Sequence, residues 1–304
     1  MMICKLLSGA ALAAFALAAP AAAQTADAAP AAATTRDADP ALWVVKDDDT
    51  TIYLFGTVHV LKPGLSWFDD AVKQAFDASD ELVLEIRQPD GKAMQKLMLQ
   101  YGLDPEQAPL SETLPEGLGA RYLKAMAGIG IPQAAADRFE PWFAATLLSV
   151  APLQKLGYDP VNGPEAVLTA AAEAAKKKLG ALETPEQQLG YLDSLSDEAQ
   201  IAFLTSTLED MDEAQAMMDA MVDRWSSGDP QALGKLLNDE LTDSPELQKI
   251  LLTDRNANWA DWIDTRLDTP GTVFVAVGAG HLAGEGSVQE QLAAHDLIAA
   301  RIDY

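Results

Sequence analysis

Strand-forming segments stand at the two ends of this chain, and a long helical stretch separates them. Near the start, residues 42–45 (LWVV) and 51–55 (TIYLF) flank three consecutive aspartates, a pattern that predicts a β-hairpin. Near the end, residues 272–277 (TVFVAV) form a β-branched apolar run that predicts a buried strand. The fold class that accommodates this order is α/β or α+β, with a mixed central sheet built from the N- and C-terminal strands and a large helical insertion between them.

The helical insertion is predicted over about residues 90–252. Prolines divide it, and Ser-Asp-Glu at 196–198 and Ser-Pro-Glu at 244–246 signal helix starts. Short apolar runs predict one strand before the insertion and another inside it, at residues 82–86 and 179–184. The remaining predicted elements are helices over residues 66–78, 255–267 and 287–294 and a strand over residues 298–302.

The first residues carry the pattern of a secretory signal peptide. Lys5 precedes a run of alanine and leucine, and the sequence AAAQ at 21–24 offers a cleavage site. We therefore expect a signal peptide over residues 1–23, a disordered leader over residues 24–40 and one folded domain over residues 41–304. The protein is then periplasmic or secreted, with no insertion into the membrane after the signal is removed.

The amino-acid composition argues against several classes of binding partner and of stabilising cross-link. The 304 residues carry a formal net charge of −25, which argues against binding to nucleic acid or to an anionic membrane surface. The single cysteine, Cys4, lies before the predicted cleavage site, so a disulfide framework and a cysteine-based zinc site are excluded. With 49% hydrophobic residues, the chain can bury a core without either.

Two of the three histidines follow strands in the same way. The strand at 51–55 runs into Gly-Thr-Val-His59, and the strand at 272–277 runs into Gly-Ala-Gly-His281. Ligands of open α/β sheets bind outside the carboxyl ends of the strands, where glycine lets the backbone turn or approach closely. We therefore expect His59 and His281 to belong to one site.

Two glutamates take the same kind of position. Glu85 ends the strand LVLE, and Glu183 ends GALE. Two imidazoles and at least one carboxylate on rigid strands form a plausible set of ligands for Mn²⁺, Zn²⁺, Co²⁺ or Fe²⁺. Three protein ligands leave a position open for water, which hydrolysis needs, and a further acid would serve as base or would orient a histidine.

Structural interpretations compete with each of these assignments. A histidine at a strand end is often a hydrogen-bonded structural residue. Glu85 is also explained by a surface salt bridge, and Glu183 by the helix start Glu-Thr-Pro-Glu. Arg255 is a candidate for stabilising an oxyanion, but a salt bridge with Asp254 or Asp261 explains it equally well. The third histidine, His295, is expected to be exposed and uninvolved.

The segments that carry these residues resemble the TraB/GumN family, which is related to the Tiki metalloproteases and to the wider erythromycin-esterase/ChaN-like group. The resemblance extends over about residues 41–304 and is closest to the GumN-like bacterial branch. The matching motifs are Leu42-Trp43, Leu54-Phe55-Gly56-Thr57-Val58-His59, the strand Leu82–Glu85, Pro141-Trp142, Leu156-Gly157-Tyr158, Leu182-Glu183-Thr184 with Glu186-Gln187, Arg255-Asn256 with Trp259, and 275–282 (VAVGAGHL).

The resemblance implies an active centre. The two Gly-x-x-His histidines and the strand-end glutamate map onto His59, His281 and Glu85, with Arg255 as a supporting residue. Tiki members are described as metal-dependent peptidases, whereas other relatives bind haem or inactivate a macrolide lactone. The chain departs from the GumN-like pattern at Gly163-Pro164-Glu165, where those chains usually have Gly-x-Asp.

Together these observations predict an exported metal-dependent hydrolase, with a peptide or protein as its substrate. A divalent metal held by His59, Glu85 and His281 would activate water, Glu183 would act as base or orient a ligand, and Arg255 would stabilise negative charge. Two alternatives remain. One is a non-catalytic binding protein for a peptide, a signal or haem, and the other is an accessory factor in envelope or polysaccharide biology.

Overall fold

The structure is a computed structural model in which residues 35–238 and 244–304 are described. Within these residues, one sheet has six strands in the order β6-β5-β7-β3-β2-β8, and a second, small sheet pairs β1 with β4. The strands are β1 (Arg36–Asp37), β2 (Leu42–Lys46), β3 (Thr50–Thr57), β4 (Leu65–Ser66), β5 (Glu81–Ile86), β6 (Lys178–Glu183), β7 (Gly271–Gly278) and β8 (Ala300–Ile302). The predicted mixed sheet, built from both ends of the chain, is confirmed.

Most of the intervening chain is helical. The α-helices are α2 (Asp70–Ala78), α3 (Gly91–Tyr101), α4 (Leu110–Thr113), α5 (Leu118–Gly128), α6 (Gln133–Ala136), α7 (Pro141–Lys155), α8 (Pro164–Ala175), α9 (Pro185–Asp193), α10 (Asp197–Asp210), α11 (Ala214–Ser226), α12 (Pro230–Asn238), α13 (Pro245–Gln248), α14 (Asp254–Leu267) and α15 (Val288–Leu292). None of the described helices combines the length and apolar character needed to cross a bilayer.

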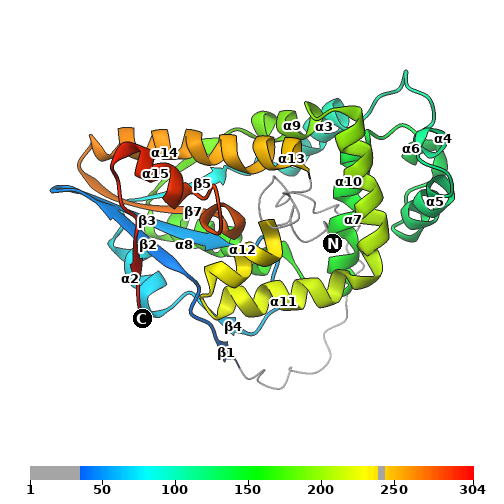
Figure 1. Cartoon of the computed structure of the whole chain (residues 1–304). Coiled ribbons are helices and arrows are strands. Elements are labelled where there is room, and N and C mark those ends of the chain that lie inside the picture. The colour runs from blue at the N-terminus through cyan, green and yellow to red at the C-terminus, as the bar shows by residue number, and fades with distance from the viewer. Residues whose placement is uncertain (1–34, 239–243) are drawn as a thin grey trace.

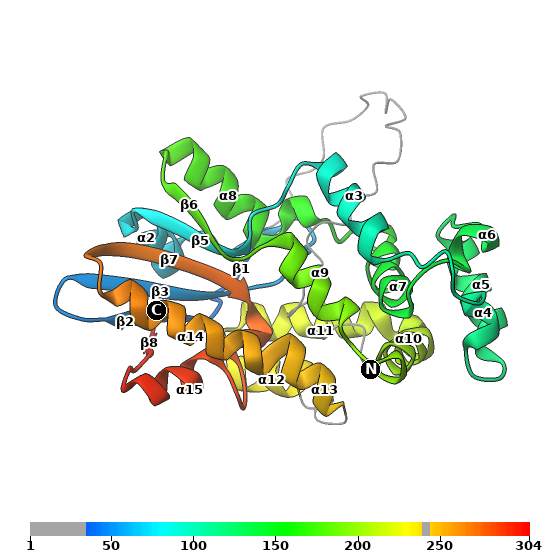
Figure 2. The same cartoon turned by 90° about the horizontal axis from the view of Figure 1, so that it is seen from above.

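The sheet is parallel on one side and antiparallel on the other. Strands β6, β5, β7 and β3 run parallel, whereas β2 forms the predicted hairpin with β3, and β8 adds antiparallel to β2. The parallel strands therefore end at one edge of the sheet. That edge faces the half of the molecule formed by helices such as α7, α10 and α11 (Figure 2).

Alternation along the strands divides the core into two layers. In β7, Val273, Val275 and Val277 pack with α14 and α15 on one face, whereas Phe274 and Ala276 join the larger cluster on the other. That larger cluster includes residues of α2 and α8 and extends into the helical half (Figure 1). A period of two on a sheet covered on both faces explains why β7 is apolar throughout.

Two boundaries differ from the sequence prediction. Residues 36–37, assigned to the disordered leader, pair with β4, and the side chain of Ala38 is buried. The ordered chain therefore starts before residue 41. The helix predicted from residue 66 begins at Asp70, because residues 65–66 form β4. The predicted signal peptide, residues 1–23, lies outside the described residues.

Candidate functional site

Four strand ends place buried polar side chains at the same edge of the sheet. His59 follows β3, Glu85 lies near the end of β5, Glu183 ends β6, and His281 follows β7 in a short 3-10 helix. Their relative exposures are 6%, 7%, 7% and 0%, respectively. Because burying an ionisable group without a partner is costly, the contacts of each side chain indicate its charge state and its role.

Arg255, near the start of α14, is the cation of this site. Its Nε donates to Glu183 Oε1 at 2.9 Å, and its Nη2 donates to Glu183 Oε2 at 2.9 Å and to Glu85 Oε2 at 2.7 Å. Burial alone would lower the pKa of Arg255, but the charges of Glu85 and Glu183 outweigh burial and raise it. Two carboxylates thus share one guanidinium, and the cluster keeps an excess of negative charge.

Glu85 is an ionised carboxylate with both oxygens occupied. Oε1 accepts from the Gly278 backbone N–H at 2.6 Å, and Oε2 accepts from Arg255 and, at 3.0 Å, from Gln188 Nε2. Burial alone would raise the pKa of Glu85, but groups led by the charge of Arg255, and including the Gly278 N–H, lower it to about 2. The interpretation of Glu85 as a surface salt bridge is therefore wrong.

Glu183, like Glu85, accepts hydrogen bonds on both carboxylate oxygens. Besides its two contacts with Arg255, Oε1 accepts from Trp259 Nε1 at 3.0 Å and Oε2 accepts from Gln188 Nε2 at 2.9 Å. The helix start that follows does not involve the Glu183 side chain, because Thr184 caps α9 in a capping box with Gln187. With donors on both oxygens, Glu183 is placed to hold Arg255 rather than to accept a proton from water.

His281 has a fixed tautomer. Its Nδ1 lies 2.5 Å from Asn256 Oδ1, and Asn256 Nδ2 donates to the Gly286 carbonyl at 2.8 Å. Because the Asn256 oxygen can only accept, Nδ1 carries the proton and Nε2 carries the lone pair. That lone pair faces Arg255 Nη1 at 3.2 Å, and Nε2 is 4.0 Å from Glu85 Oε1.

His59 is held by a different acid. Its Nδ1 lies 2.6 Å from Glu165 Oε1, which also accepts from Thr57 Oγ1 at 2.5 Å. Burial alone would lower the pKa of His59, but Glu165, through its charge and its hydrogen bond, raises it. Within the described part of the chain, His59 Nε2 is buried and has no hydrogen-bond partner. The dyad therefore orients the ring and leaves one nitrogen open.

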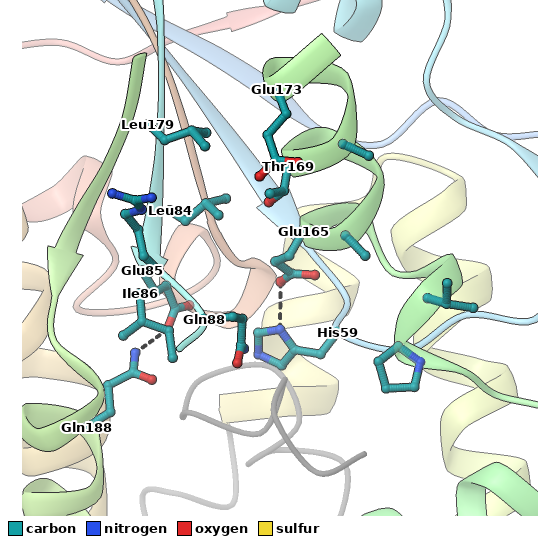
Figure 3. Close-up of a pocket in the computed structure, with 15 residues that line it drawn as sticks. His59, Leu84, Glu85, Ile86, Gln88, Glu165, Thr169, Glu173, Leu179 and Gln188 are labelled. Carbon is teal, nitrogen blue, oxygen red and sulfur yellow. Dashed lines mark hydrogen bonds and ion pairs between the residues drawn. The ribbon is translucent and has the colours of Figure 1, made fainter. Parts of the chain in front are cut away.

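A pocket of about 460 Å³ connects the two groups of side chains. It lies beside α8, and its lining includes His59, Glu85, Glu165 and Gln188 together with aliphatic side chains of β5, β6 and α8 (Figure 3). Figure 3 shows the His59–Glu165 contact at one side of the pocket and the Gln188–Glu85 contact at the other. The predicted residues thus occupy one region, divided into a His59–Glu165 dyad and an Arg255 cluster.

The orientation of the two predicted histidine ligands suits a metal, but the predicted ligands do not lie close enough together to coordinate one ion. In the neutral form of each ring, Nε2 is the lone-pair nitrogen, because Nδ1 of both histidines points to an oxygen of another side chain, the arrangement typical of metal-binding histidines. The excess of negative charge also suits a cation. In the described residues, however, no group of three or more His, Cys, Asp or Glu side chains is placed to hold a metal ion. Metal binding stays a prediction.

Three residues that contribute to the site, Glu165, Thr57 and Gln188, are not among the residues predicted from the sequence. Glu165 was noted only as a departure from a family pattern, and Gln188 and Thr57 were not considered. Among the described residues, the ion pairs of Arg255 are with Glu85 and Glu183, so the salt bridge with Asp254 or Asp261, one of its two interpretations, is not observed. His295 lies outside the site, with its ring nitrogens 3.2 and 3.3 Å from Asp261 and Asp264.

Comparisons with known proteins agree with the motifs. The chain is 31% identical over 188 residues to "Uncharacterized protein YbaP" of Escherichia coli (strain K12), covering 60% of this chain and 69% of that protein. It is 26% identical over 262 residues to an "Uncharacterized protein" of Treponema pallidum (strain Nichols), covering 78% and 75% of the two chains. No solved structure matches it significantly. The model of the TraB/PrgY/gumN family matches residues 41–301, and the chain therefore belongs to that family.

Proposed function

We propose that this chain is an exported hydrolase that cleaves peptide bonds in a peptide or protein outside the cytoplasm. The observation that carries the proposal is the open Nε2 of His59, which is buried at a pocket while Glu165 fixes the opposite nitrogen. A carboxylate that orients an imidazole in this way raises its basicity, as general-base catalysis and metal-assisted hydrolysis both require.

In this proposal, each residue of the site has a separate role. Glu165 holds the Nδ1 proton of His59, so Nε2 presents a lone pair to the pocket whenever the ring is neutral. Arg255 supplies a fixed positive charge against developing negative charge, and Glu183 keeps the guanidinium in place. A divalent metal, when bound by His59, His281 and Glu85, would supply a Lewis acid that lowers the pKa of water.

Turnover of a peptide mixture tests this proposal. Mature protein is incubated with the mixture after EDTA treatment and with added Mn²⁺, Co²⁺, Zn²⁺ or Fe²⁺, and new peptide termini are detected by mass spectrometry. We expect cleavage by the wild type and a loss of about 10–100-fold in Glu165→Gln, because loss of a partner that orients a histidine typically costs that much. Absence of new termini in every preparation would contradict the proposal.

A non-catalytic binding protein is the second candidate. The observation that favours it concerns Glu85, which lines the pocket: donors occupy both of its oxygens, which suits a rigid binding surface. Haem binding would give a visible absorbance band in wild-type protein that disappears in His59→Asn. Binding of peptide without any cleavage would favour this candidate over the hydrolase.

A further inference from the structure

The amide group of Gln188 has only one workable orientation. Gln188 lies on α9, is 2% exposed, and donates from Nε2 to Glu85 Oε2 at 3.0 Å and to Glu183 Oε2 at 2.9 Å. Rotating the amide by 180° would place its oxygen against two carboxylates, which accept but cannot donate. The two acids therefore fix Oε1 on the side away from them.

That fixed oxygen is an unused hydrogen-bond acceptor. In the described part of the molecule, Gln188 Oε1 is buried and has no hydrogen-bond partner, and Gln188 lines the pocket that also holds His59. A buried acceptor without a donor is costly, and native proteins keep few of them. A molecule that enters the pocket would supply the donor that fits this position.

The walls of the pocket indicate what carries that donor. Leu84 and Ile86 of β5, Leu179 of β6, and Ala166 and Ala170 of α8 make most of its surface apolar. Figure 3 shows Leu84 and Ile86 beside Glu85, on the same side of the pocket as Gln188. An N–H donor next to an aliphatic group is the chemistry of a peptide backbone with an aliphatic side chain.

We propose that Gln188 is a specificity-determining residue, whose Oε1 accepts a backbone N–H from a peptide segment whose aliphatic side chain packs against Leu84, Ile86 and Ala170. The inference rests on the proposed function for the peptide nature of the substrate. It concerns recognition, however, and so can be tested by binding alone, without turnover.

Amide-to-ester replacement isolates the interaction. The probes are acetyl-Ala-Leu-Ala-amide and analogues in which each backbone N–H in turn is replaced by an ester oxygen, with dissociation constants measured by NMR titration. We expect one ester to bind wild-type protein about 5–150-fold more weakly than the amide, the range for an unsatisfied buried acceptor. In Gln188→Met the amide and that ester should bind equally well.

The ratio separates recognition from a structural role. If Gln188 only supports Glu85 and Glu183, its replacement weakens both probes together and the amide-to-ester ratio stays at its wild-type value, which would overturn the proposal. Equal binding of amide and all esters by the wild type would overturn it as well.

A second variant covers the case in which Gln188→Met does not fold. Ala170→Phe fills the pocket from an exposed position, and Ala174→Phe, on the same helix but outside the lining, is its control. A further probe carries glycine in place of leucine. We expect wild-type protein and Ala174→Phe to bind the leucine probe more tightly than the glycine probe, and Ala170→Phe to lose this preference. If the probes show these preferences while no peptide is cleaved, the proposed hydrolase function fails and this inference stands. If peptides are cleaved but the amide and ester probes bind equally well, the hydrolase proposal stands and this inference fails.

Discussion

At the residue scale, Arg255 is the group on which the buried charges of the site depend. It is 1% exposed and contacts both Glu85 and Glu183. Its neighbours in the sequence offered Asp254 and Asp261 as partners, but α14 turns Arg255 toward the sheet, where the strand-end acids lie. Removing the guanidinium would leave two buried carboxylates with less compensation.

We predict that Arg255→Met lowers the free energy of unfolding by about 3–5 kcal/mol, the cost of removing one partner of a buried ion pair. Urea unfolding followed by circular dichroism measures it. The control is Lys249→Met, which removes an exposed ion pair with Asp254 and should change stability by less than about 1 kcal/mol. Equal stability of Arg255→Met and wild type would contradict the assigned role.

Individual site residues differ in how far the sequence could reveal them. His59 and His281 are detectable because an apolar strand runs into Gly-x-x-His, and Glu85 is detectable because it ends the apolar run Leu-Val-Leu. Glu165 and Gln188 act on residues 106 and 103 positions away in the chain, respectively. No local pattern reports such a contact, because it depends on how α8 and α9 pack beside the sheet.

At the element scale, the start of α8 is fitted closely to the strand end that carries His59. A Cβ atom at Gly163 would lie 2.3 Å from the His59 carbonyl oxygen, so only glycine allows this approach. The Gly-Pro-Glu segment therefore has a physical role: Gly163 permits the contact, Pro164 opens the helix, and Glu165 reaches His59.

We predict that Gly163→Ala lowers both the melting temperature and the rate of peptide cleavage, because the start of α8 has to move away from His59. The matched control is Gly190→Ala on α9, where a Cβ atom meets nothing within 4 Å. That substitution should be neutral or stabilise by up to about 1 kcal/mol, since alanine favours a helix interior over glycine. A Gly163→Ala protein as active and stable as wild type would refute the fit.

At the scale of the whole molecule, segments far apart in the sequence meet around Asp219 of α11. Its Oδ1 accepts from Tyr158 Oη at 2.5 Å and from Lys62 Nζ at 2.9 Å. These residues follow α7 and β3, so the cluster joins the helical half to the sheet. The hydrogen bonds from Tyr158 and Lys62 lower the pKa of Asp219.

A lowered pKa in the folded state makes stability depend on pH. Asp219 should stabilise the fold above its unfolded pKa of about 3.9 and lose this contribution as pH falls through its lower folded value. We predict that Asp219→Asn is less stable than wild type at pH 7 and that the difference shrinks as pH falls below about 4. Urea midpoints between pH 3 and 7 measure this, with exposed Asp212→Asn as control. A difference independent of pH would contradict it.

Much of the architecture could be predicted, and the order of its strands could not. Alternation and β-branched runs identify β2, β3, β5, β6 and β7 because each signal is local. The placement of β7 between β3 and β5 joins segments more than 180 residues apart, and no single segment specifies it. Pairing of residues 36–37 was likewise missed, because two residues carry no periodic signal.

In the proposed function the open Nε2 of His59 carries the chemistry, and the variant His59→Asn tests this role directly. The asparagine amide can still donate to Glu165 but has no counterpart of Nε2, and His295→Asn, outside the site, is the matched control. With circular dichroism confirming that both variants fold, the rate of peptide cleavage is measured. We predict a loss of at least about 100-fold in His59→Asn and an unchanged rate in His295→Asn. Cleavage by His59→Asn at the wild-type rate would contradict it.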